Sequence, residues 1–339
     1  GGAGALLFPA VEAAPAGLAV RKNVVYSLSG RGAIEVPVGT YVVHASRGIE
    51  WSLATATLEL PEGADVAWEP RLVHELDTPG WASGDFHLHT RTFSGHGDSN
   101  LAERVVSLVG EGVEFAVATD HDHHTDYGPT TAELGAGAHF TGVTGNEVST
   151  PVGHLNAFPL DPARPPVDSS ITDARVLFAL LRDEPNAYGV TPVIQLNHPR
   201  WVGIDWFGKL ALDPVTARSP RAEWSDDFDT LEVLNENAGW GYRDAELVPG
   251  QGPGAHSVLG DWFRLLNRGL RPGAVGNSDS HTVHYAFAGY PRNYVAVADG
   301  DPSALDPAEV AGALRAKRSF TTTGPFLEVA VDGAPLGAD

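Results

Sequence analysis

The stretch NLAERVVSLVGEGVEFAVATDH, residues 100–121, contains the pattern that decides the fold. Asn100 and Glu103 occupy the positions of a helix N-cap and its third residue, and apolar residues follow them at helical spacing. Residues 115–119 then form a short apolar run typical of a buried strand, and this run ends in Asp120 and His121. The stretch therefore predicts a helix followed by a strand that delivers polar side chains at its end.

The same alternation extends from residue 84 to about residue 320. Strands are expected at residues 115–119, 140–148, 155–158, 193–196, 230–234, 273–275 and 294–298. Helices are expected near residues 100–109, 173–184 and 259–268, and a last helix has Asp306 as its cap and Pro307 in its first turn. Alternation over this length predicts an α/β fold whose mostly parallel sheet closes as a barrel.

The first eighty residues have a different character. Short alternating or β-branched runs at residues 20–28, 33–45, 50–60 and 66–74 are separated by Gly, Pro and Ser turns. We therefore predict a β-sandwich-like accessory domain at residues 1–82 and the barrel at residues 83–320. Residues 321–339 return to β character and are expected to begin a C-terminal β segment.

Composition excludes several classes of protein. The 339 residues are 42% hydrophobic and 19% charged, which is typical of a globular protein, and no run approaches the ~20 apolar residues that a membrane span needs. A net charge of −21 disfavours long nucleic acids as partners. The absence of cysteine excludes disulfides, thiolate metal sites and a cysteine nucleophile. Because methionine is absent even at position 1, we expect a processed or shortened form, with a preference for an extracytoplasmic location; oligomeric state stays open.

Histidines and carboxylates recur at the predicted strand ends. His87 and His89 alternate in one strand, so both imidazoles leave the same face and can bind one metal ion. Glycines on either side of His96 let a loop return a third imidazole toward this pair. Six further residues share this placement: His121, Glu147, His154, His198, Asp279 and His281. Buried imidazoles and carboxylates need partners, so the pattern predicts a multinuclear metal site, with a structural polar network as the alternative.

Read in order, these motifs resemble the signature of the PHP (polymerase and histidinol phosphatase) superfamily. The resemblance spans about residues 84–320, and it is closer to the CehA/McbA branch of metallohydrolases, which includes carbaryl hydrolase. The closer likeness depends on four motifs: Gly80-Trp81 before Asp85-Phe86-His87, Thr119-Asp120-His121, residues 153–158 (GHLNAF), and Trp262-Phe263 with residues 265–269 (LLNRG). It implies a distorted seven-stranded β/α barrel, preceded by a β domain, that holds two or three divalent ions.

The resemblance also implies a division of the ligands among the ions. Nine residues would serve three ions: His87, His89, Glu147 and Asp279 the first, Glu147 again with His154 and His198 the second, and His96, His121 and His281 the third. Imidazole combined with carboxylate suits Zn, Mn or Fe better than Mg or Ca.

These ligands predict a metal-dependent hydrolase that cleaves a phosphoester, or a carbamate or carboxyl ester, of a small molecule with a hydroxide shared by two ions. Asp120 is a candidate base or ligand-orienting residue, and Arg200 is a candidate for binding an anionic substrate group, with a surface salt bridge as the alternative. A basic pocket would favour phosphate, and an apolar pocket lined by Trp201, Trp206 or Trp240 would favour an aryl ester. A nucleotide phosphatase or exonuclease and a catalytically silent metal-binding module stay open.

Overall fold

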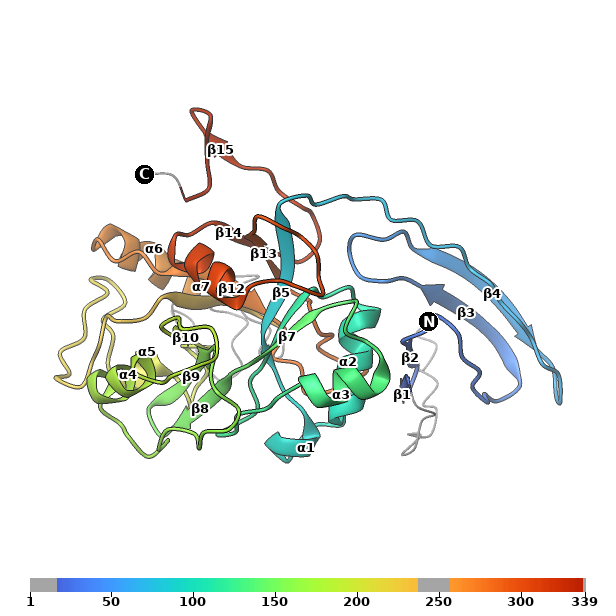
Figure 1. The fold of residues 1–339 in the computed structure, drawn as a ribbon, viewed down its shortest axis with the longest axis horizontal. Helices are drawn as coiled ribbons and strands as arrows, with labels where there is room; N and C mark the ends of the chain where they lie inside the picture. The colour runs from blue at the N-terminus through green and yellow to red at the C-terminus, as the bar shows by residue number, and fades with distance from the viewer. Residues whose placement is uncertain (1–16, 237–256, 338–339) are drawn as a thin grey trace.

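The computed structural model describes residues 17–236 and 257–337 and has a mixed α/β fold (Figure 1). Two five-stranded sheets form its larger part, and three two-stranded sheets accompany them. The strands are β1 (Leu18–Arg21), β2 (Val24–Ser27), β3 (Gly39–Ala45), β4 (Ala54–Leu60), β5 (Trp81–Leu88), β6 (Phe115–Ala118), β7 (Thr141–Thr144), β8 (Asn146–Thr150), β9 (Gly153–Phe158), β10 (Val193–Leu196), β11 (Thr230–Asn235), β12 (Gly273–Asn277), β13 (Arg292–Ala296), β14 (Ser319–Thr322), β15 (Ala330–Val331) and β16 (Ala334–Pro335). The helices are α1 (Arg91–Ser94), α2 (Leu101–Gly110), α3 (Gly128–Leu134), α4 (Ala174–Arg182), α5 (Trp206–Lys209), α6 (Val258–Asn267) and α7 (Pro307–Arg315).

The first large sheet has the strand order β14-β13-β5-β6-β7. Strands β5, β6 and β7 run parallel, whereas β13 pairs antiparallel with β5 and β14. Helix α2 lies between β5 and β6 in the chain and begins as predicted: the Asn100 side chain accepts from the Glu103 N–H, and the Glu103 carboxylate accepts from the Asn100 N–H. Its buried Val105 and Leu108 pack in the same core cluster as Ala116 of β6.

The second large sheet has the order β12-β11-β10-β9-β8. Strand β11 runs parallel to both β10 and β12, and β9 runs antiparallel to both β8 and β10. Leu177 and Phe178 of α4 and Leu265 of α6 pack with Ile194 and Leu231 of this sheet in one core cluster. Burial of each of these side chains contributes about 1.5–3 kcal/mol to stability, so the sheet and its helices form a rigid support.

The two large sheets meet at two isolated bridges. Leu88 at the end of β5 pairs with Ser280 after β12, and His121 after β6 pairs with Glu147 in β8. The α/β class is therefore confirmed. The predicted seven-stranded barrel is not confirmed, because among the described residues the strands form two separate sheets with several antiparallel pairs. Side-chain hydrogen bonds, such as those between Asn293 in β13 and Gly276 in β12, also link the two sheets.

Residues before β5 form two separate hairpins. β1 pairs with β2 beside α2, where Tyr26 packs with Val106 and Arg21 forms an ion pair with Glu103 at 2.6 Å. β3 pairs with β4 over their full length, and this hairpin extends from the side of the molecule away from the large sheets (Figure 1). The predicted strand at 66–74 is reduced to a single bridge at His74, and the two hairpins do not pair with each other in the described residues. The domain boundaries at 82 and 320 stay predictions.

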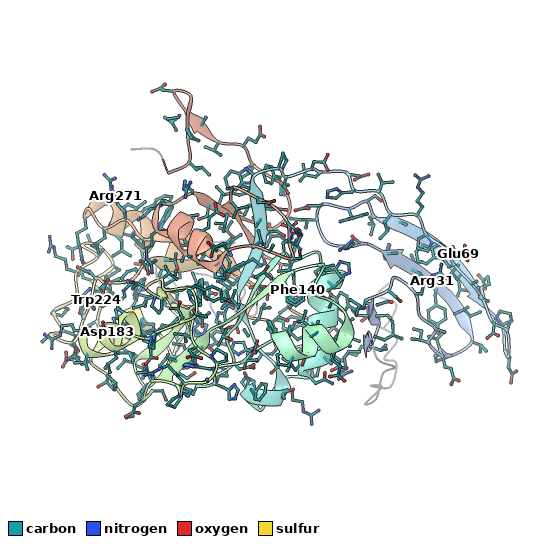
Figure 2. All side chains as sticks on the ribbon, in the orientation of Figure 1. Arg31, Glu69, Phe140, Asp183, Trp224 and Arg271 are labelled. Atoms are coloured by element: carbon teal, nitrogen blue, oxygen red, sulfur yellow. The ribbon has the colours of Figure 1, made fainter. Side chains whose placement is uncertain are left out.

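Figure 2 shows the side chains of the described residues on the same ribbon. Arg31 and Glu69, labelled there, lie on the side of the β3–β4 hairpin and are exposed, whereas Phe140, near α3, is buried. Across the described residues, no helix is both long and apolar enough to cross a bilayer. The predictions for three segments lie outside the described residues: 1–16, 237–256 and 338–339.

Candidate metal centre

His87 and His89 lie at the end of β5, close to the junction of the two large sheets. Both side chains are fully buried, and their ring centroids are 5.0 Å apart. Because side chains alternate along a strand, the spacing of two places both rings on one face, as predicted. The end of this strand therefore supplies two imidazoles to one buried region.

Two carboxylates face this pair. Glu147 comes from β8 and Asp279 follows β12, so each is brought in by a different strand of the second sheet. The His87 Nε2 atom lies 3.1 Å from Glu147 Oε1 and 3.4 Å from Asp279 Oδ1. The His89 Nε2 atom lies 3.2 Å from Asp279 Oδ1 and 3.4 Å from Glu147 Oε2.

Glu147 also faces a second group of histidines. Its Oε1 atom lies 3.2 Å from His198 Nε2 and 3.3 Å from His154 Nδ1. His154 belongs to β9 and His198 follows β10, so the antiparallel pairing of these strands brings the two imidazoles to the same carboxylate. Glu147 is fully buried and lies between the two groups.

A third group of imidazoles lies beside His89. The His281 ring stacks on the His89 ring at 4.0 Å, and the His121 ring lies 4.5 Å from His89 on another side. His96 is exposed, and its ring centroid is 4.4 Å from that of His281 and 5.1 Å from that of His121. Eight of the nine predicted ligands belong to triads whose ligand atoms lie within 4.8 Å of one another, and His96 lies at the edge of this cluster.

The hydrogen bonding of these atoms fits a cation better than a polar network. The Nε2 atoms of His87, His89 and His281 and the Oε2 atom of Glu147 are buried, and none has a hydrogen-bond partner of acceptable geometry. Two ligand atoms that are each about 2.1 Å from one tetrahedral cation lie about 3.4 Å apart. The observed separations of 3.1–3.4 Å match that spacing, so the residues present fit a divalent metal.

The second ring nitrogen of these histidines is held by neighbouring groups. His87 Nδ1 lies 2.9 Å from Glu232 Oε1, and His89 Nδ1 lies 3.1 Å from Ser94 Oγ. His281 Nδ1 lies 2.9 Å from the main-chain carbonyl two residues before it. A histidine that donates its Nδ1–H to such a group presents the Nε2 lone pair on the other side of the ring, here toward the cluster.

The charges of the cluster are strongly coupled. Burial acts to raise the pKa of Glu147, but His87, His121 and His154 lower that pKa well below its usual range. Burial likewise opposes ionisation of Asp279, whereas neighbouring histidines lower its pKa. Burial and the nearby His281 lower the pKa of His89, which favours its neutral imidazole. Burial acts to lower the pKa of His87 and of His121, but Asp279 and Glu147 raise both pKa values, so metal binding at these two imidazoles would displace protons.

Asp120 is fully buried and is surrounded by donors. Its Oδ1 atom accepts from the Thr90 N–H and the Ser94 hydroxyl, both at 2.6 Å, and its Oδ2 atom accepts from the Thr125 hydroxyl at 2.7 Å. Ser94 in turn lies against His89. These contacts favour the ligand-orienting role for Asp120, and its role as a base stays a prediction.

Arg200 forms a bidentate ion pair with Asp261, at 2.8 Å from Nε to Oδ2 and 3.0 Å from Nη2 to Oδ1. The pair is almost completely buried rather than on the surface, because the Asp261 side chain is 1% exposed and the Arg200 side chain 11%. Arg200 also lines a cavity of about 590 Å³ with Phe207 and Arg218, and none of the nine predicted ligands lines it. Its substrate-binding role stays a prediction.

The tryptophans considered as substrate contacts differ in position. The Trp201 ring lies 5.4 Å from the His198 ring in an edge arrangement. Trp206 is 1% exposed, and its Nε1–H donates to the His154 carbonyl at 2.6 Å. Trp240 lies outside the described residues. Only Trp201 is therefore both beside a predicted ligand and partly exposed.

Glu232 lies next to the predicted ligands but is not among the residues predicted from the sequence. This residue lies in the middle of β11 and has no exposed surface, and it contacts both His87 and His198. Its only signal was a carboxylate inside an otherwise apolar strand, which is unusual because a buried charge needs specific partners. Those partners come from other strands, so the run 230–234 alone does not reveal them.

Comparison with known proteins gives a weak structural likeness. No family model matches the chain, and no curated protein matches it. Among solved structures, the chain is similar to a two-domain protein from Bacteroides vulgatus ATCC 8482 that is described as containing a predicted PHP-like metal-dependent phosphoesterase. The identity is 16%, the TM-score is 0.45, and the match covers 77% of this chain and 70% of the other. At these values membership of the PHP superfamily and of its CehA/McbA branch stays a prediction.

Proposed function

We propose that this protein is a metal-dependent hydrolase of the PHP type that binds two or three divalent ions. The observation that carries the proposal is the convergence of eight imidazole and carboxylate side chains in four overlapping groups of three, with the ligand atoms of each group within 4.8 Å of one another. These side chains come from strand ends of both large sheets, and several of their ligand atoms are buried without hydrogen bonds. Such an arrangement is costly unless a cation satisfies it.

The proposed division of labour is the one that the PHP resemblance implies, and most of the contacts agree with it. His121 Nδ1 also lies 2.9 Å from Glu147 Oε2, so His121 contacts the bridging carboxylate as well. Glu147 bridges, since its carboxylate faces His87 and His89 on one side and His154 and His198 on the other. Asp279 completes the first group, and His96, His121 and His281 form the third. Divalent ions bound there would supply a deprotonated water near neutral pH and stabilise charge on the substrate oxygen. The donor set favours Zn, Mn or Fe.

For the substrate, we place a carbamate or carboxyl ester of a small molecule first and a phosphoester second. The one guanidinium predicted to bind an anionic group, Arg200, is neutralised by Asp261. Trp201 instead offers an aromatic edge beside His198. Both observations favour an uncharged, partly apolar substrate over a dianionic phosphate monoester.

The test combines elemental analysis with a substrate panel. Purified protein is analysed for Zn, Mn and Fe, loaded with each metal, and assayed with p-nitrophenyl acetate, an aryl carbamate, p-nitrophenyl phosphate and thymidine 5′-p-nitrophenyl phosphate. Faster turnover of the ester or carbamate supports the first choice. Preference for the thymidine ester would instead favour the nucleotide phosphatase or exonuclease.

Two matched variants complete the design. His89→Ala removes a predicted ligand, and we expect it to lose both metal and turnover. His44→Ala changes a histidine of the β3–β4 hairpin that contacts Thr55, and we expect it to retain both. Firm metal binding without turnover of any substrate would favour the catalytically silent module. Failure of the wild-type protein to bind any of the three metals would overturn the proposal.

A further inference from the structure

Glu232 is a buried carboxylate for which the proposed chemistry has no direct use. It lies in the middle of β11, the strand between β10 and β12, and its exposed fraction is 0%. Among the described residues, no lysine or arginine forms an ion pair with it, and the only ionisable partner is His87. Removing a carboxylate from water is costly unless hydrogen bonds satisfy both of its oxygens.

Both oxygens of Glu232 accept two hydrogen bonds each. Oε1 accepts from His87 at 2.9 Å and from the Asn277 amide at 3.0 Å. Oε2 accepts from the His198 main-chain N–H at 2.7 Å and from the Asn235 amide at 2.8 Å. The peptide N–H of His198 can only donate, so this side of Glu232 must be an acceptor.

The orientation of the Asn277 amide is fixed independently. Its Oδ1 atom accepts from the Phe86 main-chain N–H at 3.1 Å and from the Asn293 amide at 3.0 Å, so its NH₂ group faces Glu232. With one fixed donor already on Oε1, the remaining partner there is the Nδ1 atom of His87. The simplest assignment gives His87 an Nδ1–H that donates to Glu232.

This hydrogen bond decides which nitrogen of His87 is free. With the proton on Nδ1, the Nε2 lone pair is directed toward Glu147 and Asp279, 3.1 and 3.4 Å away. The same carboxylate restrains His198, whose backbone φ of 24° is unfavourable for a residue with a side chain. Glu232 thus acts on predicted ligands of two different ion positions at once.

We propose that Glu232 is a positioning residue for the metal centre: it selects the Nδ1–H tautomer of His87 and holds the main chain of His198 in its ligating position. The inference rests on the proposed function, because it assigns Glu232 a role toward ions that His87 and His198 would bind. It makes a distinct claim, since the same nine ligands could bind metal without depending on this carboxylate.

Glu232→Gln tests the claim with almost no change in shape. Glutamine keeps one acceptor and replaces the other with an NH₂ group, and this group cannot face the His198 N–H without placing two donors together. Turned toward His87, the same group also faces the NH₂ group of Asn277, so neither orientation satisfies every donor around it. We expect the orientation toward His87, because the imidazole can still accept at Nδ1 if it carries its proton on Nε2. That proton would occupy the position from which Nε2 faces Glu147.

The first measurement is the tautomer of neutral His87 in metal-free protein, read from ¹H–¹⁵N correlations of the imidazole and assigned by loss of the signal in His87→Asn. It is made at alkaline pH, because burial acts to lower the pKa of His87 but Asp279 and Glu147 outweigh it and raise that pKa. We expect Nδ1–H in the wild type and Nε2–H in Glu232→Gln. The wild-type measurement stands even if the variant does not fold, and an Nε2–H tautomer in the wild type would overturn the proposal.

The second measurement is zinc affinity, by competition with a chelator. We expect Glu232→Gln to bind zinc about 10–100-fold more weakly than the wild type, the usual effect of losing a group that orients a ligand. Glu50→Gln is the matched control, because Glu50 is also a buried carboxylate, bonded to the Tyr294 hydroxyl at 2.6 Å and 3.3 Å from His74 Nε2, away from the predicted ligands. We expect it to keep wild-type affinity.

The outcomes separate this inference from the proposed function. Wild-type zinc affinity in a folded Glu232→Gln protein would contradict the positioning role of Glu232, and the proposal of a metal centre would be unaffected. Absence of zinc binding in the wild type would remove the proposed function itself. An equal loss of affinity in Glu50→Gln would mean that neutralising any buried glutamate has this effect, and it would also contradict the proposal.

Discussion

At the scale of single residues, Glu147 carries more contacts to the predicted ligands than any other side chain described here. Its two oxygens lie within 3.4 Å of ring nitrogens from His87, His89, His154 and His198. A carboxylate can bridge two cations, whereas a carboxamide offers only one weak oxygen donor. The effect of changing this residue should therefore reach beyond one ion.

Glu147→Gln is expected to reduce the metal content by two ions per chain, because one side chain serves both positions. Elemental analysis of protein dialysed after loading with zinc measures this loss. His44→Ala serves as the control and should keep the wild-type content. Full metal content in Glu147→Gln would contradict the bridging role, and loss of one ion would assign Glu147 to a single position.

At the scale of elements, helix α2 links the N-terminal hairpin to the first large sheet. Its N-terminus is closed by the reciprocal hydrogen bonds of Asn100 and Glu103, and Glu103 also pairs with Arg21 of β1. The helix ends at Gly110 and is followed by its C-cap Glu111, which accepts from the Tyr26 hydroxyl. The helix also supplies Arg104, whose guanidinium donates to the His89 and Ser280 carbonyls at 3.0 and 2.8 Å. The stability of helix α2 therefore affects the main chain that carries His89 at the predicted metal centre.

Asn100→Ala should destabilise the protein by about 1 kcal/mol, because the Glu103 N–H loses its acceptor at the first turn. Urea denaturation followed by circular dichroism measures the change. Asn100→Asp keeps a side-chain acceptor and should retain most of the stability. An alanine variant as stable as the wild type would show that the cap contributes nothing in this context.

Glu111 gives a pH-dependent prediction. Burial raises the pKa of Glu111 above its ordinary value of 4.5. The charged form is therefore less favourable in the folded than in the unfolded protein, and this cost develops as pH rises above about 4.5. The position at the C-terminal end of α2 also disfavours a negative charge. Glu111→Gln should thus gain stability relative to the wild type as pH rises from 4.5 to 7.

Urea denaturation of both proteins at several pH values measures the difference. Glu59→Gln is the control, since Glu59 also accepts from a hydroxyl, that of Thr40 at 2.8 Å, but is exposed. We expect no comparable gain in that variant. A stability difference between Glu111→Gln and the wild type that stays constant with pH, or falls, would contradict the assignment.

At the scale of the whole molecule, the centre joins the two large sheets. Ligands from β5 and β6 belong to one sheet, and ligands from β8, β9 and the segments after β10 and β12 belong to the other. Two isolated bridges, Leu88–Ser280 and His121–Glu147, link the main chains of the two sheets next to these ligands. Ions bound at this junction should therefore stabilise the arrangement of the sheets.

Removal of metal by a chelator is expected to lower the melting temperature, and addition of zinc should restore it. A ligand at 100 times its Kd stabilises the folded state by about 2.7 kcal/mol per site, so the shift should be of several degrees. Thermal unfolding with and without EDTA measures it. Glu147→Gln should show a smaller shift, and an unchanged melting temperature in the wild type would argue against metal at the junction.

Much of the local structure follows from short patterns. The start of α2 at Asn100, the start of α7 after Asp306 and the bounds of β10 agree with prediction, because caps and apolar periodicity act within a few residues. No strand forms at residues 66–74 apart from the single bridge at His74, because composition alone does not produce a strand where no partner strand pairs with the run.

The α/β class and the nine candidate ligands can be predicted from the amino-acid sequence, since both depend on residue type and short-range spacing. Three contacts become visible only in the folded chain: Glu147 lies between two groups of histidines, Asp261 holds Arg200, and Glu232 reaches His87 across 145 positions of the chain. The physical reason is that a hydrogen bond or ion pair depends on separation in space. Pairing of distant strands sets that separation, and no local pattern encodes it.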